Sequence, residues 1–471
     1  MPVIIVTFLA LAAAAFLGHL ATAGSQTMLL ILALGVMVSV FAFLSPKASL
    51  TLLVFSMLLS PKLGFGAVSS AREAVIRYDD ILLVVIFFSW FARTAIYKHK
   101  AFITSTPVQA PVLFYTSIYV LSTLMGIMRG NIAVKTSVFY LLKYVEYFLL
   151  YFMTVNIVDT KEEIKKYLGY GAVVALIVTI YAFYSYQSAG FDARATAPFE
   201  ATLGSSGASS EPASLGGYYL VIFGVLLGLM TEYSGRALIL VMAAMAFMFP
   251  AFLLTFSRAS YIGFFFMALA LLALARRRKA LMAVFFCAAL LLVSLFPVLS
   301  QKVMSRITMT YQGNLATETV NVGAGGQVKM ESSAAARVAS LRRVVLQNLP
   351  EHPFLGWGVT GIGLGDTQYA LILGEVGITG FFIFIWMIYK VFFTAREVYR
   401  AYSEPWIKAM SLGLMMVVVG LLFQSVGVNT FIIVRIMEPF WFLTALVMVL
   451  YRGIPKDITT AAGETSPENT I

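Results

Sequence analysis

The stretch "ALILVMAAMAFMFPAFLLTFSRASYIGFFFMALALLALARRRK", residues 237–279, decides the fold. It contains two apolar runs, 237–255 and 260–275, with a single arginine, Arg258, between them. A helix of about 20 apolar residues crosses a hydrocarbon layer of about 30 Å, so the runs are predicted to be consecutive membrane helices. The basic residues that end the stretch are typical of the cytoplasmic end of such a helix.

The same pattern recurs along the whole chain of 471 residues, which is 60% hydrophobic and 12% charged, with a mean hydropathy of +0.88. Soluble domains are about 25% charged, so a water-soluble globule is excluded. We predict an all-α integral membrane protein with about 14 transmembrane helices, the first of them retained rather than cleaved as a signal peptide. The predicted spans lie near residues 3–21, 27–45, 49–61, 80–97, 109–127, 136–157, 168–187, 216–232, 237–255, 260–275, 280–297, 369–391, 408–426 and 430–451.

The net charge of +11 would indicate a nucleic-acid partner in a soluble protein, but here the retention of basic residues on the cytoplasmic side explains much of it. We therefore predict no nucleic-acid partner. The basic clusters fall on one side if the spans alternate, and both termini are then cytoplasmic. The clusters are Lys98 with Lys100, Lys161 with Lys165 and Lys166, Arg276 to Lys279, and Arg396 with Arg400 and Lys408.

This register divides the chain into segments with different environments. They are N-terminal helices (1–189), a first external loop (190–216), further helices (217–297), a large external loop (298–368), C-terminal helices (369–451) and a disordered cytoplasmic tail (452–471). Long loops are usually functional. In the large loop, "AAARVASLRRVVLQNL" predicts a helix with Val338, Leu341, Val345 and Leu349 on one apolar face.

External arginines are the residues that the cytoplasmic bias leaves unexplained: Arg194, Arg258, Arg337, Arg342 and Arg343. Guanidinium groups from separate loops bind phosphate oxygens, whereas a single external arginine is more often solvated or in contact with lipid headgroups. Arg258 differs because it directly follows a long apolar run. A charge at the hydrocarbon edge is costly and has to face protein, water or a ligand.

His352 lies in "EHPFLGWGVTGIG", where glycines allow close approach of the backbone to a ligand. A loop histidine is often incidental, but a neutral imidazole can also accept a proton from a sugar hydroxyl. The sequence leaves both readings open. Glu375, in "LGEVGITG", either braces the junction between loop and helix or reaches an arginine.

Two pairs of charged residues within the predicted helices are interpreted as structural ion pairs. Lys143 with Glu146 and Arg435 with Glu438 are spaced to pair on one helix face, with an ion or proton pathway as the less favoured alternative.

Asp79 and Asp80 stand at a helix entry, where acids cap free N–H groups. Cys287 is the only cysteine, and no clustered His/Asp ligand set is found, so no metal and no cofactor are predicted.

Four stretches, in this order, resemble the O-antigen ligase and O-antigen polymerase family of polysaccharide assembly. They are "RATAPFEATLGSSGASSEPASLGGYYL", "TFSRASYIGF", "ARVASLRRVVLQNLPEHPFLGWGVTGIG" and "DTQYALILGEVGITGFFIF", within residues 190–451. The resemblance implies a GT-C-like glycosyltransferase of the bacterial inner membrane. Its substrate would be an undecaprenyl-pyrophosphate-linked oligosaccharide, used on the periplasmic face without metal or nucleotide sugar. Flippase and chain-length regulator proteins are the partners that it implies.

The resemblance also implies roles for individual residues. Arg194 and Arg258 would bind the donor's pyrophosphate with support from Arg337, and His352 would contact or activate the acceptor hydroxyl. Asp366, Tyr369 and Glu375 are candidate supporting residues. Ala197 stands in "RATAPF" where the family usually has glycine, which leaves the geometry of that turn open.

The sequence "GDTQYALILGEVGI" favours a polymerase of O-antigen, capsule or exopolysaccharide, because ligases often have a His-Asn pair there. A ligase that transfers the glycan to lipid A core is the alternative. A flippase or transporter of lipid-linked glycans is the alternative from another class, although no internal repeat is found and the arginines gather at the rim rather than within the bundle.

Overall fold

The structure is a computed structural model that describes residues 26–69, 72–97, 104–188, 194–199, 212–275, 327–363 and 367–455, with short pieces between 277 and 321. In this part of the chain nine helices are long and apolar enough to cross a membrane, and three shorter apolar helices accompany them. The predicted span near 3–21, most of the predicted span near 280–297 and the tail after residue 455 lie outside the described residues. The prediction of a helical membrane protein is therefore confirmed, while the predicted number of 14 spans is not.

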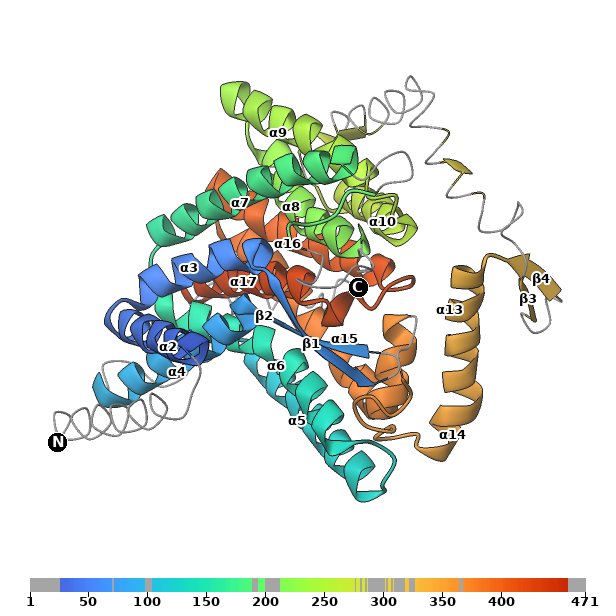
Figure 1. The fold of residues 1–471 in the computed structure, drawn as a ribbon. Helices are drawn as coiled ribbons and strands as arrows, with labels where there is room; N and C mark the ends of the chain where they lie inside the picture. Colours follow the sequence, from blue (N-terminus) through green and yellow to red (C-terminus); the bar gives the residue numbers. More distant parts are fainter. Residues whose placement is uncertain are drawn as a thin grey trace, which may run out of the picture.

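The helices follow one another along the chain and form one bundle (Figure 1). They are α2 (Gln26–Leu44), α3 (Pro46–Leu59), α4 (Tyr78–Tyr97), α5 (Gln109–Met128), α6 (Val134–Ile157), α7 (Lys161–Ser188), α8 (Pro212–Glu232), α9 (Gly235–Leu253), α10 (Arg258–Leu274), α13 (Ser332–Arg343), the π-helix η2 (Val344–Asn348), α14 (Leu349–Glu351), α15 (Gln368–Ala401), α16 (Pro405–Gln424), the 3₁₀ helix η3 (Thr430–Ile432) and α17 (Val434–Arg452).

Two short antiparallel hairpins, which the sequence analysis did not anticipate, lie in links between helices. One pairs β1 (Lys62–Ser69) with β2 (Arg72–Arg77) and leads into α4. The other pairs β3 (Glu318–Asn321) with β4 (Gln327–Met330) and leads into α13.

Small residues explain the closest helix contact in the core, between α8 and α16. Gly224 and Gly228 stand four residues apart on α8, a spacing that lets two membrane helices approach closely. A methyl group on Gly224 would lie 2.8 Å from the carbonyl oxygen of Gly413 on α16, and the reverse holds for Gly413. With α17, these helices form the buried centre, while α4, α7 and α9 remain largely exposed on the outside.

Basic residues of the predicted cytoplasmic clusters gather at one end of the bundle, which we call the lysine end. Lys161 lies 2.5 Å from Glu404 at the start of α16, and Lys165 stacks on Trp406. Arg278 donates to the carbonyl of Tyr233 after α8. Three of the four predicted basic clusters contribute to this end, and Lys98 and Lys100 lie outside the described residues.

The opposite end, which we call the arginine end, carries the N-termini of α8, α10 and α17. Beside it, α13, η2 and α14 form a continuous rod along the edge of the bundle (Figure 1). The predicted helix of the large loop is therefore confirmed, but its predicted apolar face is wrong. Ala335, Ser340 and Val344 are buried, whereas Leu341 and Val345 are exposed, so the face that the helix turns to the bundle is not the predicted stripe.

Candidate functional site

Arg258 begins α10 at the arginine end. Ser257 caps the helix by accepting a hydrogen bond from the backbone N–H of Ser260 at 3.4 Å. Arg258 Nη1 lies 2.5 Å from Glu331 Oε2 at the start of the α13 rod, and both side chains are about one-fifth exposed. The charge at the hydrocarbon edge thus faces protein, one of the three environments that the sequence required.

Arg337 reaches the same place from α13. A methyl group on Gly427, in the loop between α16 and α17, would lie 3.0 Å from the Ala259 side chain and 3.9 Å from Arg337 Nε. Arg337 and the first turn of α10 therefore meet at this glycine. Arg342 and Arg343, further along α13, are exposed.

Arg194 begins the short described segment 194–199, which crosses the arginine end. The Ala195 N–H donates to the carbonyl of Leu254 at 2.9 Å, beside the turn that leads to Arg258. At the other end of the segment, Arg435 Nη2 donates to the carbonyl of Phe199 at 3.1 Å. Through these two contacts the segment links the turn before Arg258 to a fourth arginine, Arg435, on α17. We call Arg194, Arg258, Arg337 and Arg435 the arginine cluster.

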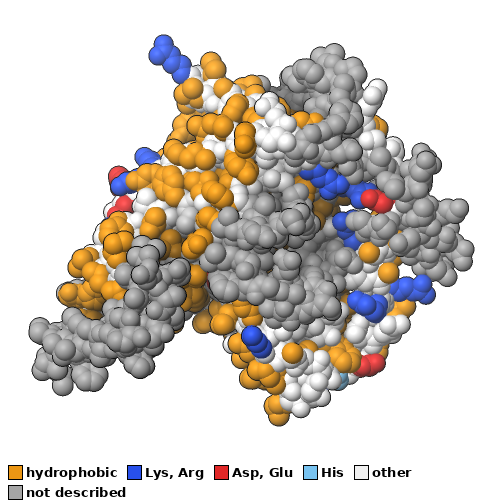
Figure 2. All heavy atoms as spheres, viewed as in Figure 1, with side chains coloured by type: hydrophobic (Ala, Val, Ile, Leu, Met, Phe, Trp, Pro, Cys, Tyr) orange, Lys and Arg blue, Asp and Glu red, His pale blue; other side chains and the backbone are white. Residues whose placement is uncertain are grey.

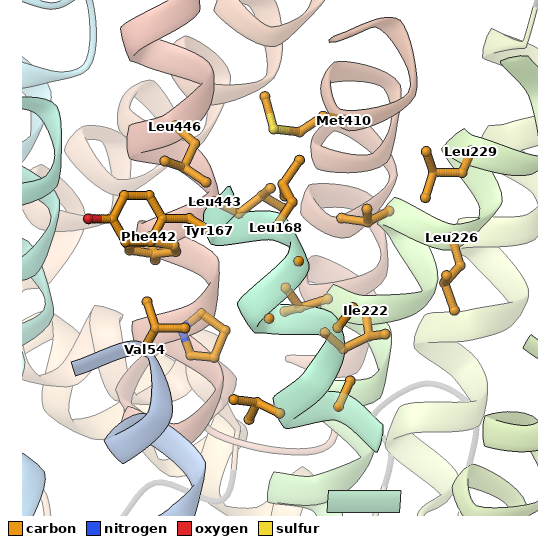
Figure 3. Close-up of a pocket in the computed structure, with 18 of the residues that line it drawn as sticks. Val54, Tyr167, Leu168, Ile222, Leu226, Leu229, Met410, Phe442, Leu443 and Leu446 are labelled. Atoms are coloured by element: carbon orange, nitrogen blue, oxygen red, sulfur yellow. The ribbon is translucent and has the colours of Figure 1, made fainter. Parts of the chain in front are cut away.

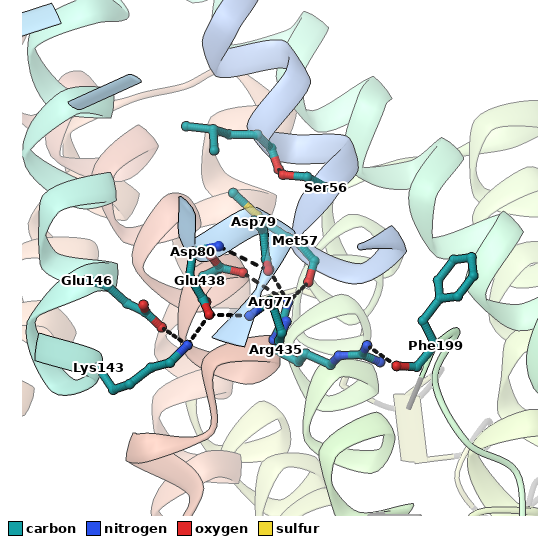
Figure 4. A network of polar contacts seen from close by, with 11 residues as sticks. Ser56, Met57, Arg77, Asp79, Asp80, Lys143, Glu146, Phe199, Arg435 and Glu438 are labelled. Atoms are coloured by element: carbon teal, nitrogen blue, oxygen red, sulfur yellow. Dashed lines mark hydrogen bonds and ion pairs between the residues drawn. The ribbon is translucent and has the colours of Figure 1, made fainter. Parts of the chain in front are cut away.

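Arg435 is the residue of this cluster that the sequence analysis missed. Its local pairing with Glu438 was expected, but the ion pair of Glu438 is with Arg77, at 3.7 Å, and the Arg435 side chain extends toward Phe199 (Figure 4). Arg435 is only 2% exposed. Its position at the start of the last span, the same end as Arg258, is the signal that could have found it.

Two strained residues flank the cluster. Phe199 has φ 54° and Phe256, two residues before Arg258, has φ 47°. Bulky residues rarely adopt positive φ, and such strain gathers at functional sites where surrounding contacts enforce it. Beneath them, Gln424 Nε2 donates to Ser260 Oγ at 3.0 Å and to the carbonyl of Ala213 at 3.1 Å, so a polar floor joins α16, α10 and α8.

The electrostatics of this end favour an anion. Guanidinium groups form bidentate hydrogen bonds to phosphate, and the N-termini of α8, α10 and α17 add the positive ends of three helix dipoles. Figure 2 shows Lys and Arg side chains gathered around a hollow next to α10. Among the described residues, no group of three or more His, Cys, Asp or Glu is placed to hold a metal ion. The arrangement can bind a phosphate or diphosphate group.

His352 lies far from this cluster. It follows α14 at the distal end of the rod, which has 12, 5 and 3 residues in α13, η2 and α14. A helix of that length spans about 30 Å, and Arg258 contacts the other end through Glu331. The His352 ring packs edge-on against Trp357 at 4.6 Å between centroids. In this arrangement, His352 and Arg258 do not reach the same reacting atom.

The glycines after His352 allow the loop to pack closely against neighbouring helices. Gly377 breaks α15 with φ 67°, and the loop runs into the gap. The N–H groups of Trp357 and Gly358 donate to the carbonyls of Gly374 and Glu375, each at 2.9 Å. Gly356, with φ 67°, touches the same unwound turn. These glycines thus allow close approach to protein backbone, where the sequence analysis had considered a ligand.

Gly356→Ala tests this packing. The new methyl would lie 2.6 Å from the carbonyl of Glu375 on a residue with positive φ, so we expect the free energy of unfolding to fall by about 2–4 kcal/mol. Thermal unfolding of purified protein measures it. Gly171→Ala, in open space within α7, is the matched control and should not destabilise. Equal stability of the two variants would refute the close packing of Gly356 against the backbone of α15.

The supporting candidates hold the loop and the start of α15. Glu375 is fully buried, and its Oε1 accepts from the Thr360 N–H at 2.9 Å, so it braces the junction, one of its two expected roles. The Tyr369 hydroxyl donates to the carbonyl of Leu422 on α16 at 2.7 Å. Asp366 lies outside the described residues.

An apolar cavity of about 560 Å³ lies between α3, α7, α8, α9, α16 and α17. Leucine, valine and aromatic side chains such as Leu226, Phe442 and Leu446 line it (Figure 3). At one side its wall includes Tyr218, next to Gly217, where a methyl group would lie 2.8 Å from Gln424 of the polar floor. The lining is almost entirely apolar, so the cavity can accommodate a hydrocarbon chain.

Together these features define a helical membrane protein with an arginine cluster, suited to an anion, at one end of its bundle. No protein-family model matches the chain, and no curated protein matches it.

Proposed function

We propose that the chain is a glycosyltransferase that polymerises a polysaccharide from undecaprenyl-pyrophosphate-linked repeat units on the periplasmic side of a bacterial inner membrane. The observation that carries the proposal is the arginine cluster, whose four residues are brought to one end of the bundle by four separate segments. Its position at the ends of membrane helices suits a diphosphate at the membrane surface, whose hydrocarbon chain remains in the bilayer or in the apolar cavity.

The order of the four sequence motifs supports the same class, because three of the arginines that the resemblance implies belong to the cluster. A transporter or flippase of lipid-linked glycans needs positive side chains along its path through the bundle. The four arginines of the cluster instead lie at one end of the bundle.

The chemistry that we propose is a single displacement. The acceptor hydroxyl oxygen forms a bond to the anomeric carbon, the bond from that carbon to the diphosphate oxygen breaks, and the hydroxyl proton leaves to a base. Guanidinium groups stabilise the negative charge that grows on the diphosphate, which can supply a large part of the rate enhancement. Inversion at the anomeric carbon follows from one displacement.

The proposed role of His352 as that base requires the rod to move. In the described arrangement His352 follows one end of the rod and Arg258 contacts the other end through Glu331, and a helix of this length spans about 30 Å. The arginines, rather than His352, therefore define the donor site of this proposal.

The test is an assay of purified protein with an undecaprenyl-pyrophosphate-linked repeat unit. A ladder of longer glycans formed without nucleotide sugar or added metal is the expected result. Transfer only after lipid A core is supplied would indicate the ligase instead. Movement of the lipid-linked glycan between leaflets of a vesicle, with no glycosidic product, would replace the enzyme by a flippase.

Glu331→Gln should strengthen donor binding. In the described arrangement the Glu331 carboxylate lies 2.5 Å from Arg258 and competes with a phosphate oxygen for the guanidinium. Removing its charge should lower the KM for the lipid diphosphate donor several-fold with little change in kcat. Glu351→Gln, an exposed glutamate at the distal end of the rod, is the control. A raised KM in Glu331→Gln alone would show that Glu331 supports donor binding instead.

A further inference from the structure

A buried cluster of charged residues lies inside the bundle, next to the arginine cluster. We call Arg77, Asp79, Asp80, Lys143, Glu146 and Glu438 the ion cluster. They come from the end of β2, the first turn of α4, the middle of α6 and the first turns of α17 (Figure 4). Lys143 is slightly exposed at its side chain, and the other five are buried.

The ion pairs form two short chains, in each of which one cation contacts two carboxylates. Arg77 pairs with Asp79 and, at 3.7 Å, with Glu438. Lys143 pairs with Asp80 and, at 3.4 Å, with Glu146, so the pair that the sequence predicted on α6 is confirmed within a larger network. The backbone N–H of Arg77 donates to Asp80 at 2.6 Å and joins the two chains.

The charges in this cluster do not balance. Four carboxylates and two cations leave a net charge of −2 when all are ionised, and counting Arg435, one turn away on α17, still leaves −1. An uncompensated charge in a low-dielectric interior costs several kcal/mol, so such groups bind a proton or a cation instead. A proton bound to one carboxylate reduces this excess of negative charge.

Glu438 is the carboxylate with the weakest contacts to cations and hydrogen-bond donors in the ion cluster. It is 1% exposed, its Oε2 makes no hydrogen bond to the described residues, and its cation is the more distant partner of Arg77. Asp79 and Asp80 have close cationic partners, and Glu146 is within hydrogen-bonding distance of Lys143. A proton on Glu438 reduces the net charge of the six groups of the ion cluster from −2 to −1.

We propose that Glu438 is a proton-binding site within the membrane-spanning bundle, and that its proton controls whether Arg435 is available to an anion at the arginine cluster. Glu438 and Arg435 are three residues apart on α17 and share one face of the helix. When Glu438 is neutral, Arg435 extends outward to Phe199, as Figure 4 shows. When Glu438 loses its proton, the carboxylate attracts the guanidinium inward.

Charged groups on the other helices packed against α17 do not alter this balance. Glu232 on α8 accepts from Tyr399, and Lys47, on the loop-to-helix start of α3, pairs with Glu163. Glu375 on α15 accepts from the Thr360 N–H. Lys408 on α16 stacks on Tyr399 near the lysine end. Those that face Glu438 are therefore Arg77, Asp79, Asp80, Lys143, Glu146 and Arg435.

Infrared spectroscopy of the purified protein in lipid tests the proton directly and needs no substrate, so it is independent of the proposed glycosyl transfer. At neutral pH the wild-type spectrum should contain one carboxylic acid C=O band that Glu438→Gln lacks. Glu232→Gln, a buried glutamate outside the cluster, is the matched control and should retain the band. Loss of a carboxylate band, rather than a carboxylic acid band, in Glu438→Gln would overturn the proposal.

Stability provides a second readout. If the folded state holds a proton that the unfolded state releases, the free energy of unfolding is highest at lower pH and falls as pH rises through the titration of folded Glu438. Wild-type Tm should therefore fall from neutral to alkaline pH, and Glu438→Gln should be less sensitive and at least as stable at neutral pH. A large loss of Tm in Glu438→Gln at neutral pH would mean that Glu438 acts as an ionised partner of Arg77.

Binding of inorganic pyrophosphate to wild-type and Glu438→Gln protein tests the link to Arg435, which rests on the proposed anion site. Wild-type affinity should weaken several-fold from neutral to alkaline pH, and Glu438→Gln should remove most of this change. Equal pH dependence in both would refute the link. Absence of pyrophosphate binding in both, with the infrared band present, would refute the anion site and leave the proton site standing.

Discussion

Arg258→Ala should reduce glycan transfer by about 100-fold to 1,000-fold, because removing one preorganised donor from a developing anion typically costs that much. Arg258 is the member of the arginine cluster best placed for this role, since it stands at the N-terminus of α10 and its side chain is about one-fifth exposed. Its present partner, Glu331, is a carboxylate that a phosphate oxygen can replace. The rate of ladder formation with purified protein measures the effect.

Two further variants show whether the loss is specific. Arg258→Lys keeps the charge but loses the fork that binds two oxygens, so it should recover only part of the rate. Arg236→Ala removes an exposed arginine at the start of α9, near the lysine end, and should leave the rate unchanged. An Arg258→Ala protein that is folded and transfers glycan at the wild-type rate would exclude the cluster as the donor site.

Arg77→Ala should lower the free energy of unfolding by about 3–5 kcal/mol, the typical cost of removing one partner from a buried ion pair. Arg77 is 5% exposed, contacts Asp79 and Glu438, and donates to the carbonyl of Met57 at 2.6 Å. Burial alone would lower the pKa of Arg77, but Asp79, Glu438 and neighbouring carboxylates raise it above its usual value. Without the guanidinium, Asp79 is left buried and uncompensated.

Lys161→Ala is the matched control for this buried ion pair. Lys161 lies 2.5 Å from Glu404, but both side chains are about two-fifths exposed, and such pairs contribute less than about 1 kcal/mol. The hydrogen bond from Lys161 lowers the pKa of Glu404 without burying either charge. Thermal unfolding in the same detergent compares the variants. Similar losses from Arg77→Ala and Lys161→Ala would mean that burial of the ion cluster does not govern its contribution.

The sequence by itself determined the class of protein and most of its elements. Apolar length and basic clusters are local properties, so helices α4 to α10 and α15 to α17 follow from them, as does the helix after Glu331. Composition also marked Arg258 as exceptional. The two hairpins were not found, because short strands between helices have no apolar run to reveal them.

Only the tertiary structure decided which residues meet. Arg435 binds the carbonyl of Phe199, in the segment that begins at Arg194, more than 200 residues away along the chain. Glu438 meets Arg77 instead of its helix neighbour, and the rod keeps His352 away from Arg258 although both residues carry motif signals. Spacing along a helix fixes which side chains share a face, but it does not fix which other helix packs there. That choice depends on the packing of small residues such as Gly224 and Gly413 and on the compensation of buried charge, both of which join distant parts of the chain.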